Sequence, residues 1–268
     1  MKLLLVALLV AALPAQAARR VPRKAAARVR PEDDPRKKGN DKAFARARIV
    51  FDAPDDRAEL PAGDAVVALT VTGYALGNGP HAHLIVDGEP ALQLDRDGAY
   101  VIHGLAPGPH VVRAVLCRPW HEVLKARHAF ALARFWLGPR LTGKAGKAAE
   151  YVAWPDPRKP LLTYVLPLGH SSPALELWRE DGHVVPASSG SDRPLLDFYL
   201  SGTKLARRGS KVRLVLDRRE LPLLTDWKPL FLRHARPGPH RLTIDLLDRR
   251  GRKSPNPLNR TDRTFVAK

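Results

Sequence analysis

The chain has 268 residues, enough for one large domain or two of ordinary size. Lys and Arg outnumber Asp and Glu by 45 to 27, a net charge of +18, and 44% hydrophobic residues are normal for a globular protein, which excludes wholesale disorder. The single cysteine excludes a disulfide framework within the chain and any multi-cysteine zinc or iron–sulfur site. Met1 is the only methionine, so a folded domain has no thioether ligand for a blue-copper centre.

Residues 1–17 predict a cleaved export signal. Lys2 is followed by an unbroken apolar run from Leu3 to Leu13 and then by the small-residue pattern Ala15-Gln16-Ala17. A charged start, an apolar middle and an A-x-A exit are the three parts of a secretory signal peptide. The alternative is a buried core helix, but the run is terminal and too short to cross a bilayer, which takes about 20 residues. We therefore expect a periplasmic or secreted protein with no transmembrane segment in the mature chain.

Residues 18–43 predict a basic, disordered arm, because a segment so rich in charge cannot bury enough apolar area to offset the entropy lost on ordering. Its cations include Arg19, Arg20, Arg23, Lys24, Arg28, Arg30, Arg36, Lys37 and Lys38. Such an arm can attract an anionic envelope component, either lipid or polysaccharide, and the alternative is a solvated tether. The arm has no aromatic residues interleaved with its cations and no nucleic-acid motif, so we expect no nucleic-acid partner.

The chain after the arm predicts short strands. Runs rich in β-branched residues occur in the first half at 66–71, 84–86, 100–102 and 111–116. Turn signals separate them, namely Gly77-Asn78-Gly79-Pro80, Asp87-Gly88, Asp97-Gly98 and Pro107-Gly108-Pro109. Seven such runs fit an immunoglobulin-like sandwich of about 100 residues, and no long segment has the helical period.

An internal repeat predicts a second domain of the same fold. A shift of 130 residues places Leu84-Ile85-Val86-Asp87 on Leu214-Val215-Leu216-Asp217, and the tetrapeptide Pro107–His110 on an identical Pro237–His240. We therefore predict an all-β chain of two tandem immunoglobulin-like sandwiches. The expected domains are residues 44–138 and 159–268, joined by a linker at 139–158 in which glycine and proline break the periodicity.

Three patterns in the first half carry a resemblance: His-x-His-Leu-x-x-Asp at 81–87, Leu-x-Pro-Gly-x-His at 105–110 and Trp-His-Glu-x-x-Lys at 120–125. In the second half, the pattern Leu-Leu-Asp-Phe-Tyr-Leu at 195–200 carries the same resemblance. The chain resembles a group of exported bacterial proteins that carry tandem immunoglobulin-like domains. The resemblance implies the architecture and no particular chemistry, because one sandwich fold hosts unrelated functions.

Histidines gather in the first domain in a pattern that fits a metal site. His81 and His83 alternate with apolar residues, so both point away from the core on one strand face. In an immunoglobulin-like topology that strand lies antiparallel to the strand ending at Cys117. The candidate ligands for Zn²⁺ or Cu²⁺ are therefore His81, His83, Cys117, His121, Glu122 and His128. The alternative is that the histidines are ordinary surface imidazoles.

His110 and His240 predict a structural role instead. Each follows a Pro-Gly-Pro turn and opens a core strand, once in each domain. A ring nitrogen bonded to a nearby carbonyl would fix that corner, much as a tyrosine corner does in other sandwiches.

Catalytic motifs are missing from the sequence: there is no Gly-x-Ser-x-Gly elbow, phosphate loop or Gly-x-Gly-x-x-Gly. Cys117 and His121 suggest a thiolate–imidazole pair but lack an orienting group. We therefore expect a non-catalytic envelope or extracellular module, binding or structural, that needs no cofactor and whose partner is an anionic envelope component or another envelope protein. The alternative is a periplasmic protein that binds zinc or copper through the histidine cluster.

Overall fold

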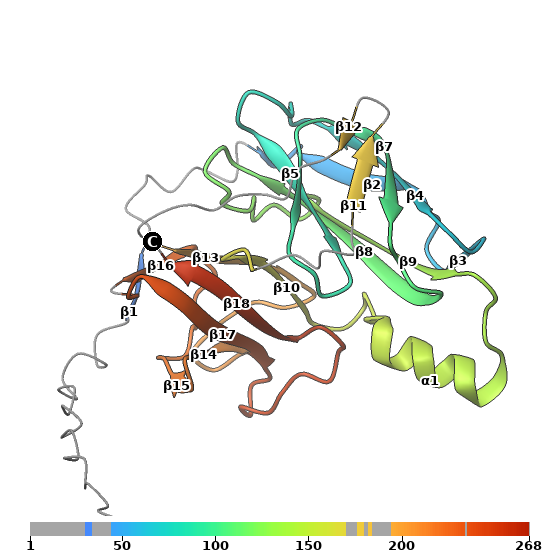
Figure 1. Ribbon diagram of the computed structural model, residues 1–268. Coiled ribbons are helices and arrows are strands. Elements are labelled where there is room, and N and C mark those ends of the chain that lie inside the picture. Colours follow the sequence, from blue (N-terminus) through green and yellow to red (C-terminus); the bar gives the residue numbers. More distant parts are fainter. Residues whose placement is uncertain are drawn as a thin grey trace, which may run out of the picture.

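A computed structural model describes residues 30–33, 44–169, 176–179, 182–183, 194–233 and 235–267. Four β-sheets form two sandwiches, which confirms the prediction of an all-β chain with two tandem domains (Figure 1). The expected export signal at 1–17 and most of the expected arm at 18–43 lie outside the described residues.

The first sandwich pairs two five-stranded sheets, of order β12-β11-β7-β4-β2 and β3-β9-β8-β5-β6. Their strands are β2 (Arg48–Ala53), β3 (Ala58–Leu60), β4 (Ala65–Thr72), β5 (His81–Val86), β6 (Leu92–Leu94), β7 (Gly98–His103), β8 (Gly108–Cys117), β9 (Phe130–Leu137), β11 (Glu176–Arg179) and β12 (Gly182–His183). Inward residues such as Val67, Leu84, Ala114 and Phe135 alternate along these strands and form one buried core between the sheets.

The second sandwich pairs two four-stranded sheets, of order β1-β16-β13-β10 and β15-β14-β17-β18. Their strands are β1 (Arg30–Asp33), β10 (Leu161–Leu166), β13 (Leu195–Ser201), β14 (Lys211–Leu216), β15 (Arg219–Glu220), β16 (Leu230–Arg233), β17 (Gly238–Leu247) and β18 (Arg260–Ala267). Its core contains Phe198, Leu214, Ile244 and Phe265.

Two segments pair where the expected domain boundaries do not place them. Residues 30–33, within the expected disordered arm, form β1, which pairs antiparallel with β16. Strand β11 follows β10 of the second sandwich in the chain, yet it pairs with β7 of the first sandwich. The physical reason is common to both, because an edge strand presents unpaired backbone groups that another segment can satisfy.

The expected linker at 139–158 contains a helix, α1 (Gly143–Ala153), where the glycines suggested irregular chain. Gly146 is buried in it, and a Cβ at this position would lie 2.0 Å from the Leu141 carbonyl oxygen, so the close approach requires glycine. Trp154 follows the helix and packs edge-on against Trp136 of β9, with ring centroids 6.5 Å apart. Within the described part of the chain, no helix is long and apolar enough to span a membrane.

The internal repeat is visible in the strand pairing. His81 lies opposite Cys117 in the β5–β8 pair, and Lys211 lies opposite Leu247 at the same place in the β14–β17 pair. The expected histidine corner is also confirmed. His110 Nε2 lies 2.7 Å from the Ala106 carbonyl oxygen and its Nδ1 lies 2.8 Å from an Asp87 carboxylate oxygen. His240 repeats both contacts in the second sandwich.

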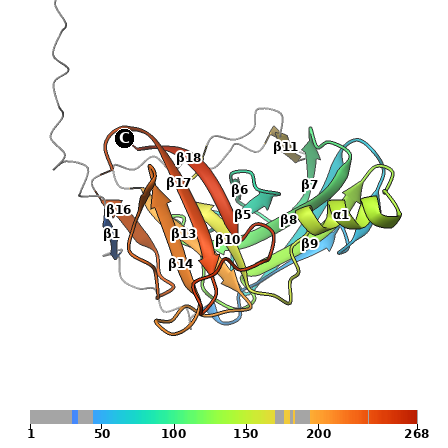
Figure 2. The ribbon, with the colours of Figure 1, turned by 90° about the horizontal axis from the view of Figure 1, so that it is seen from below.

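The two sandwiches share a third apolar cluster between them. The outer face of β5 and β8 packs against the outer face of β10 and β13, so these strands lie next to one another where the two sandwiches meet (Figure 2). This interface cluster comprises Ile85, Ala91, Val115, Cys117, Val123, Val165, Leu166, Leu168, Leu195 and Tyr199. Burial on both faces explains why residues 195–200 are apolar on successive positions, apart from Asp197, rather than alternating apolar with polar.

A buried histidine–cysteine cluster as a candidate metal centre

His81, His83 and Cys117 lie together on the outer face of the first sandwich. Strands β5 and β8 are antiparallel, with His81 directly opposite Cys117, so the three side chains share one face as the sequence predicted. Their exposure differs from the expectation, because His81 is only 1% exposed and His83 and Cys117 are fully buried. The second sandwich covers this face at Cys117, and the loop after β8 covers it at the histidines.

The loop after β8 folds His121 back over the two strand histidines. The Arg118 amide donates to the Glu122 carbonyl (2.8 Å) and the His121 amide donates to the Arg118 carbonyl (2.9 Å), which closes a tight turn. A bridge between Cys117 and Val123 then returns the chain alongside β8. His121 sits in the left-handed region with φ +67°, a conformation that is costly for any residue with a Cβ.

Three imidazole nitrogens converge at the spacing of a metal site. His81 Nε2 lies 3.1 Å from His83 Nε2, and His121 Nδ1 lies 3.3 Å from the same His83 nitrogen. Nitrogens that bind one tetrahedral ion at 2.0–2.1 Å are separated by about 3.3–3.4 Å. The ligand atoms of His81, His83 and Cys117 also lie within 4.8 Å of one another. The ligand atoms of two histidines and the cysteine thus lie close enough to share one ion, and His121 adds a third imidazole beside His83.

The ring of His81 is held so that its inner nitrogen is available. Its Nδ1 lies 2.7 Å from the Gly79 carbonyl oxygen, a contact that requires the proton on Nδ1 and leaves Nε2 with its lone pair. A backbone carbonyl in this position is a common partner of metal-binding imidazoles, because it fixes both tautomer and orientation. At His83, Nδ1 is buried and has no hydrogen-bond partner among the described residues.

Burial favours the neutral forms of His81, His83 and Cys117. It lowers the pKa of His81 and lowers that of His83 further, where the two neighbouring imidazoles add to the effect. The same desolvation raises the pKa of the Cys117 thiol well above its usual value. A raised pKa is the opposite of what an activated cysteine nucleophile needs, so the Cys117–His121 pair does not have the character of a catalytic dyad.

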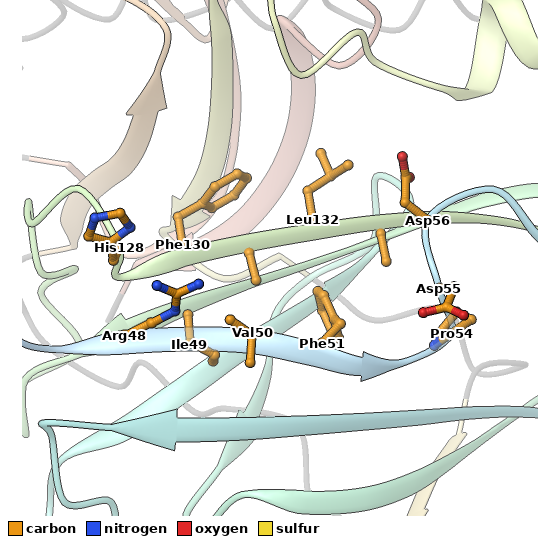
Figure 3. Close-up of a pocket in the computed structure, with 12 residues that line it drawn as sticks. Arg48, Ile49, Val50, Phe51, Pro54, Asp55, Asp56, His128, Phe130 and Leu132 are labelled. Carbon is orange, nitrogen blue, oxygen red and sulfur yellow. The ribbon is translucent and has the colours of Figure 1, made fainter.

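Glu122 and His128, the remaining candidate ligands, have other surroundings. The Glu122 carboxylate accepts a hydrogen bond from the Trp120 indole (2.8 Å) and lies 3.7 Å from Arg118 Nε. His128 is exposed and lines a groove between β2 and β9, next to Arg48 (Figure 3). Among the described residues, the group of close ligand atoms contains His81, His83 and Cys117 and does not include His128.

The second sandwich shows which parts of the site the fold requires. The repeat places Lys211 and Arg213 where the first sandwich has His81 and His83. Gly251 stands where the first sandwich has His121, with a φ of +77° in a turn of the same hydrogen bonding. Glycine is the residue expected at this backbone conformation, so the fold itself does not ask for histidine there. His121 therefore occupies a backbone position that favours glycine, and the equivalent position of the second sandwich has glycine.

Asp197 was absent from the sequence-based candidates, although it supports the site from the second sandwich. It is fully buried in β13, where its carboxylate accepts a hydrogen bond from the Val123 amide (2.9 Å) and pairs with Lys125 Nζ (3.1 Å). The signal was present in the sequence, since one acid interrupts the apolar run Leu195–Leu200. Its partner was not, because Lys125 is 72 residues away in the other sandwich.

No protein-family model and no curated protein matches the chain. Solved structures give distant likenesses to modules of the fibronectin-III type. The fibronectin(III)-like modules of Clostridium thermocellum CbhA are 12% identical, with 82% of this chain and 94% of that chain covered and a TM-score of 0.27. Bacteroides ovatus SGBP-B, solved with a mixed-linkage heptasaccharide, is 12% identical over 81% and 70% of the two chains, with a TM-score of 0.23. The central fibronectin-III array of RIM-binding protein is 8% identical over 83% and 69%, with a TM-score of 0.24.

Proposed function

We propose that this protein is an exported, non-catalytic module that binds a zinc or copper ion between His81, His83, His121 and Cys117. The observation that carries the proposal is the convergence of three imidazole nitrogens, 3.1 and 3.3 Å apart, beside a buried thiol. Imidazole suits both metals, and thiolate suits zinc and Cu(I). Metal binding would displace the thiol proton of Cys117, so protons are released as the ion enters.

The donor set supports a binding role rather than catalysis. Three nitrogens and one sulfur fill the four positions of a tetrahedral ion, whereas catalytic zinc keeps one position open for water or substrate. The cluster is also buried, with only His121 partly exposed among its four members. A metal held there would be shielded from substrates, which favours storage, transport or structural stabilisation over hydrolysis.

Titration of the metal-free full-length protein with Zn²⁺, and separately with Cu⁺ under reducing conditions, tests the proposal. Calorimetry or competition with a chromophoric chelator should show one site of micromolar or tighter affinity, and His83→Ala should abolish it. His128→Ala is the matched control, because it removes an exposed imidazole outside the cluster and should leave the affinity unchanged. Unchanged heats in His83→Ala, or equal losses in both variants, would refute the assignment.

The expected attraction of residues 18–43 to anionic lipid or polysaccharide is a separate proposal. It rests on the net positive charge of that segment, most of which lies outside the described residues. Such an attraction would hold the module near the envelope surface while the folded part carries the metal. The export part of the proposal is supported by residues 1–17, which have the pattern of a secretory signal peptide.

A further inference from the structure

The loop that supplies His121 is fastened to the second sandwich. Its amide at Val123 donates to Asp197 Oδ2 (2.9 Å), and Lys125 Nζ lies 3.1 and 3.2 Å from the two Asp197 oxygens. A few residues further on, the Tyr199 hydroxyl donates to the Ala126 carbonyl (2.8 Å). The second sandwich therefore binds both the backbone and a side chain of the segment that follows His121.

Burial of the Asp197 carboxylate favours the docked position of the segment that follows His121. It is fully buried, and desolvation raises its pKa against the opposing effect of Lys125 and the Val123 amide. A buried charge without its partners is costly, so the docked arrangement of the loop is the one that compensates Asp197. Movement of the loop away from the second sandwich would leave that charge uncompensated.

Cys117, a second member of the proposed site, lies in the interface between the two sandwiches. Its side chain belongs to the apolar cluster between the sandwiches, together with Val123, Val165 and Tyr199. Of the four proposed ligands, Cys117 thus lies in the interface and His121 is carried by a loop that the interface holds. The geometry of the site depends on the docking of the second sandwich.

We infer that metal binding and docking of the two sandwiches are coupled, with Asp197 as the residue that positions the His121 loop from the second sandwich. The inference rests on the proposed metal function and adds a regulation to it. Because coupling between two equilibria is reciprocal, docking raises metal affinity by the same factor by which the metal strengthens docking. Substitution of residues that orient metal ligands typically weakens affinity by about 10–100-fold, which sets the expected size.

The test compares Asp197→Asn with Asp245→Asn in the full-length protein, using Zn²⁺ as the probe. Asp245 is a matched control, since it is a buried acid of the same sandwich whose ion pairs in the described part of the chain are with Arg213 (2.7 Å) and Arg260 (3.3 Å). We expect the dissociation constant for zinc to rise at least tenfold in Asp197→Asn and to stay within twofold in Asp245→Asn. Equal affinity in Asp197→Asn and the wild type would overturn the coupling.

A second readout separates positioning from general loss of structure. Co²⁺ in place of zinc should give the wild type a four-coordinate spectrum with a sulfur-to-metal charge-transfer band, and Asp197→Asn should keep that band while the ligand-field bands change. Hydrogen exchange at the Val123 amide should slow when zinc binds to the wild type. Zinc protection confined to residues 81–83 and 117–121 would contradict the coupling.

The outcomes distinguish the two proposals. Failure of the wild type to bind zinc or copper removes the proposed function itself. Binding by the wild type with no effect of Asp197→Asn removes the coupling alone. Should Asp197→Asn fail to fold, Tyr199→Phe replaces it, because this change deletes only the hydroxyl that donates to Ala126, and it should weaken zinc binding in the same direction.

Discussion

We predict that the backbone conformation of His121 lowers the stability of the metal-free protein. Comparison with Gly251, the equivalent residue of the second sandwich, shows which substitution would test this. A residue with a Cβ at φ +67° costs about 1–2 kcal/mol, and Gly251 at the equivalent position of the second sandwich avoids that cost. Glycine also has greater conformational freedom in the unfolded chain, which lowers the free energy of unfolding by about 0.5–1 kcal/mol and so offsets part of that difference. In the absence of metal, we therefore expect His121→Gly to be more stable than His121→Ala by about 0.5–1 kcal/mol.

The assay is denaturant unfolding of the wild type and both variants, first with a chelator and then with zinc. At a free zinc concentration 100 times the dissociation constant, a site that binds only the folded state adds about 2.7 kcal/mol to the stability of the wild type. Both variants should lose most of that gain, since each lacks the third imidazole. His121→Gly is thus expected to be the more stable variant without metal and to respond weakly to zinc.

Gly251→Ala serves as the control for the backbone effect. A Cβ at Gly251 meets no atom within 4 Å, so the change introduces only the unfavourable φ. It should destabilise the protein by about 1 kcal/mol and leave the response to zinc intact. The reasoning is refuted if His121→Gly is no more stable than His121→Ala, or if zinc stabilises His121→Gly as much as the wild type.

Three further predictions follow from other parts of the molecule. Desolvation lowers the pKa of His110, but the hydrogen bonds and charge of Asp87 and the Ala106 carbonyl outweigh it, so the net pKa is raised. The His110–Asp87 pair therefore stabilises the fold fully below about pH 6.5 and loses this contribution as the pH rises through the raised pKa. The stability difference between wild type and Asp87→Asn should shrink between pH 6 and pH 8, and a difference that grows would contradict the prediction. Leu116→Ala and Leu246→Ala each remove a fully or almost fully buried side chain and should cost about 2–5 kcal/mol in urea unfolding, whereas losses under 1 kcal/mol would mean a loosely packed core. Deletion of residues 18–29, which leaves strand β1 in place, should weaken retention on anionic vesicles at low salt while the zinc affinity stays unchanged, and a full-length protein that is not retained would make the arm a tether.

Local sequence patterns were sufficient for the architecture of each sandwich. Alternation along residues 81–86 and 111–117 predicted which side chains face the core, and the shift of 130 residues predicted that both halves share one strand pairing. The corner at His110 was also predictable, because turn, strand start and carbonyl lie within a few residues of one another. In each of these cases the interacting groups are close in the chain or related by the repeat.

The helix α1 and the strands β1 and β11 were not predictable in this way. Gly146 reads as a helix breaker, yet it lets the helix approach Leu141 more closely than a Cβ would allow. Strand β11 joins β7 because that edge is available in space, and nothing in residues 176–179 specifies the partner. Edge pairing is decided by which backbone groups remain unpaired after the sandwiches form.

The sequence alone determined that His81, His83, Cys117 and His121 can meet, because strand alternation, antiparallel pairing and a short loop are local properties. It did not determine that the cluster is buried. Only the tertiary structure places the second sandwich over this face and brings Asp197 to the His121 loop. Burial of a strand's outer face depends on packing between distant segments, and a strand covered on one face or on both follows the same backbone geometry.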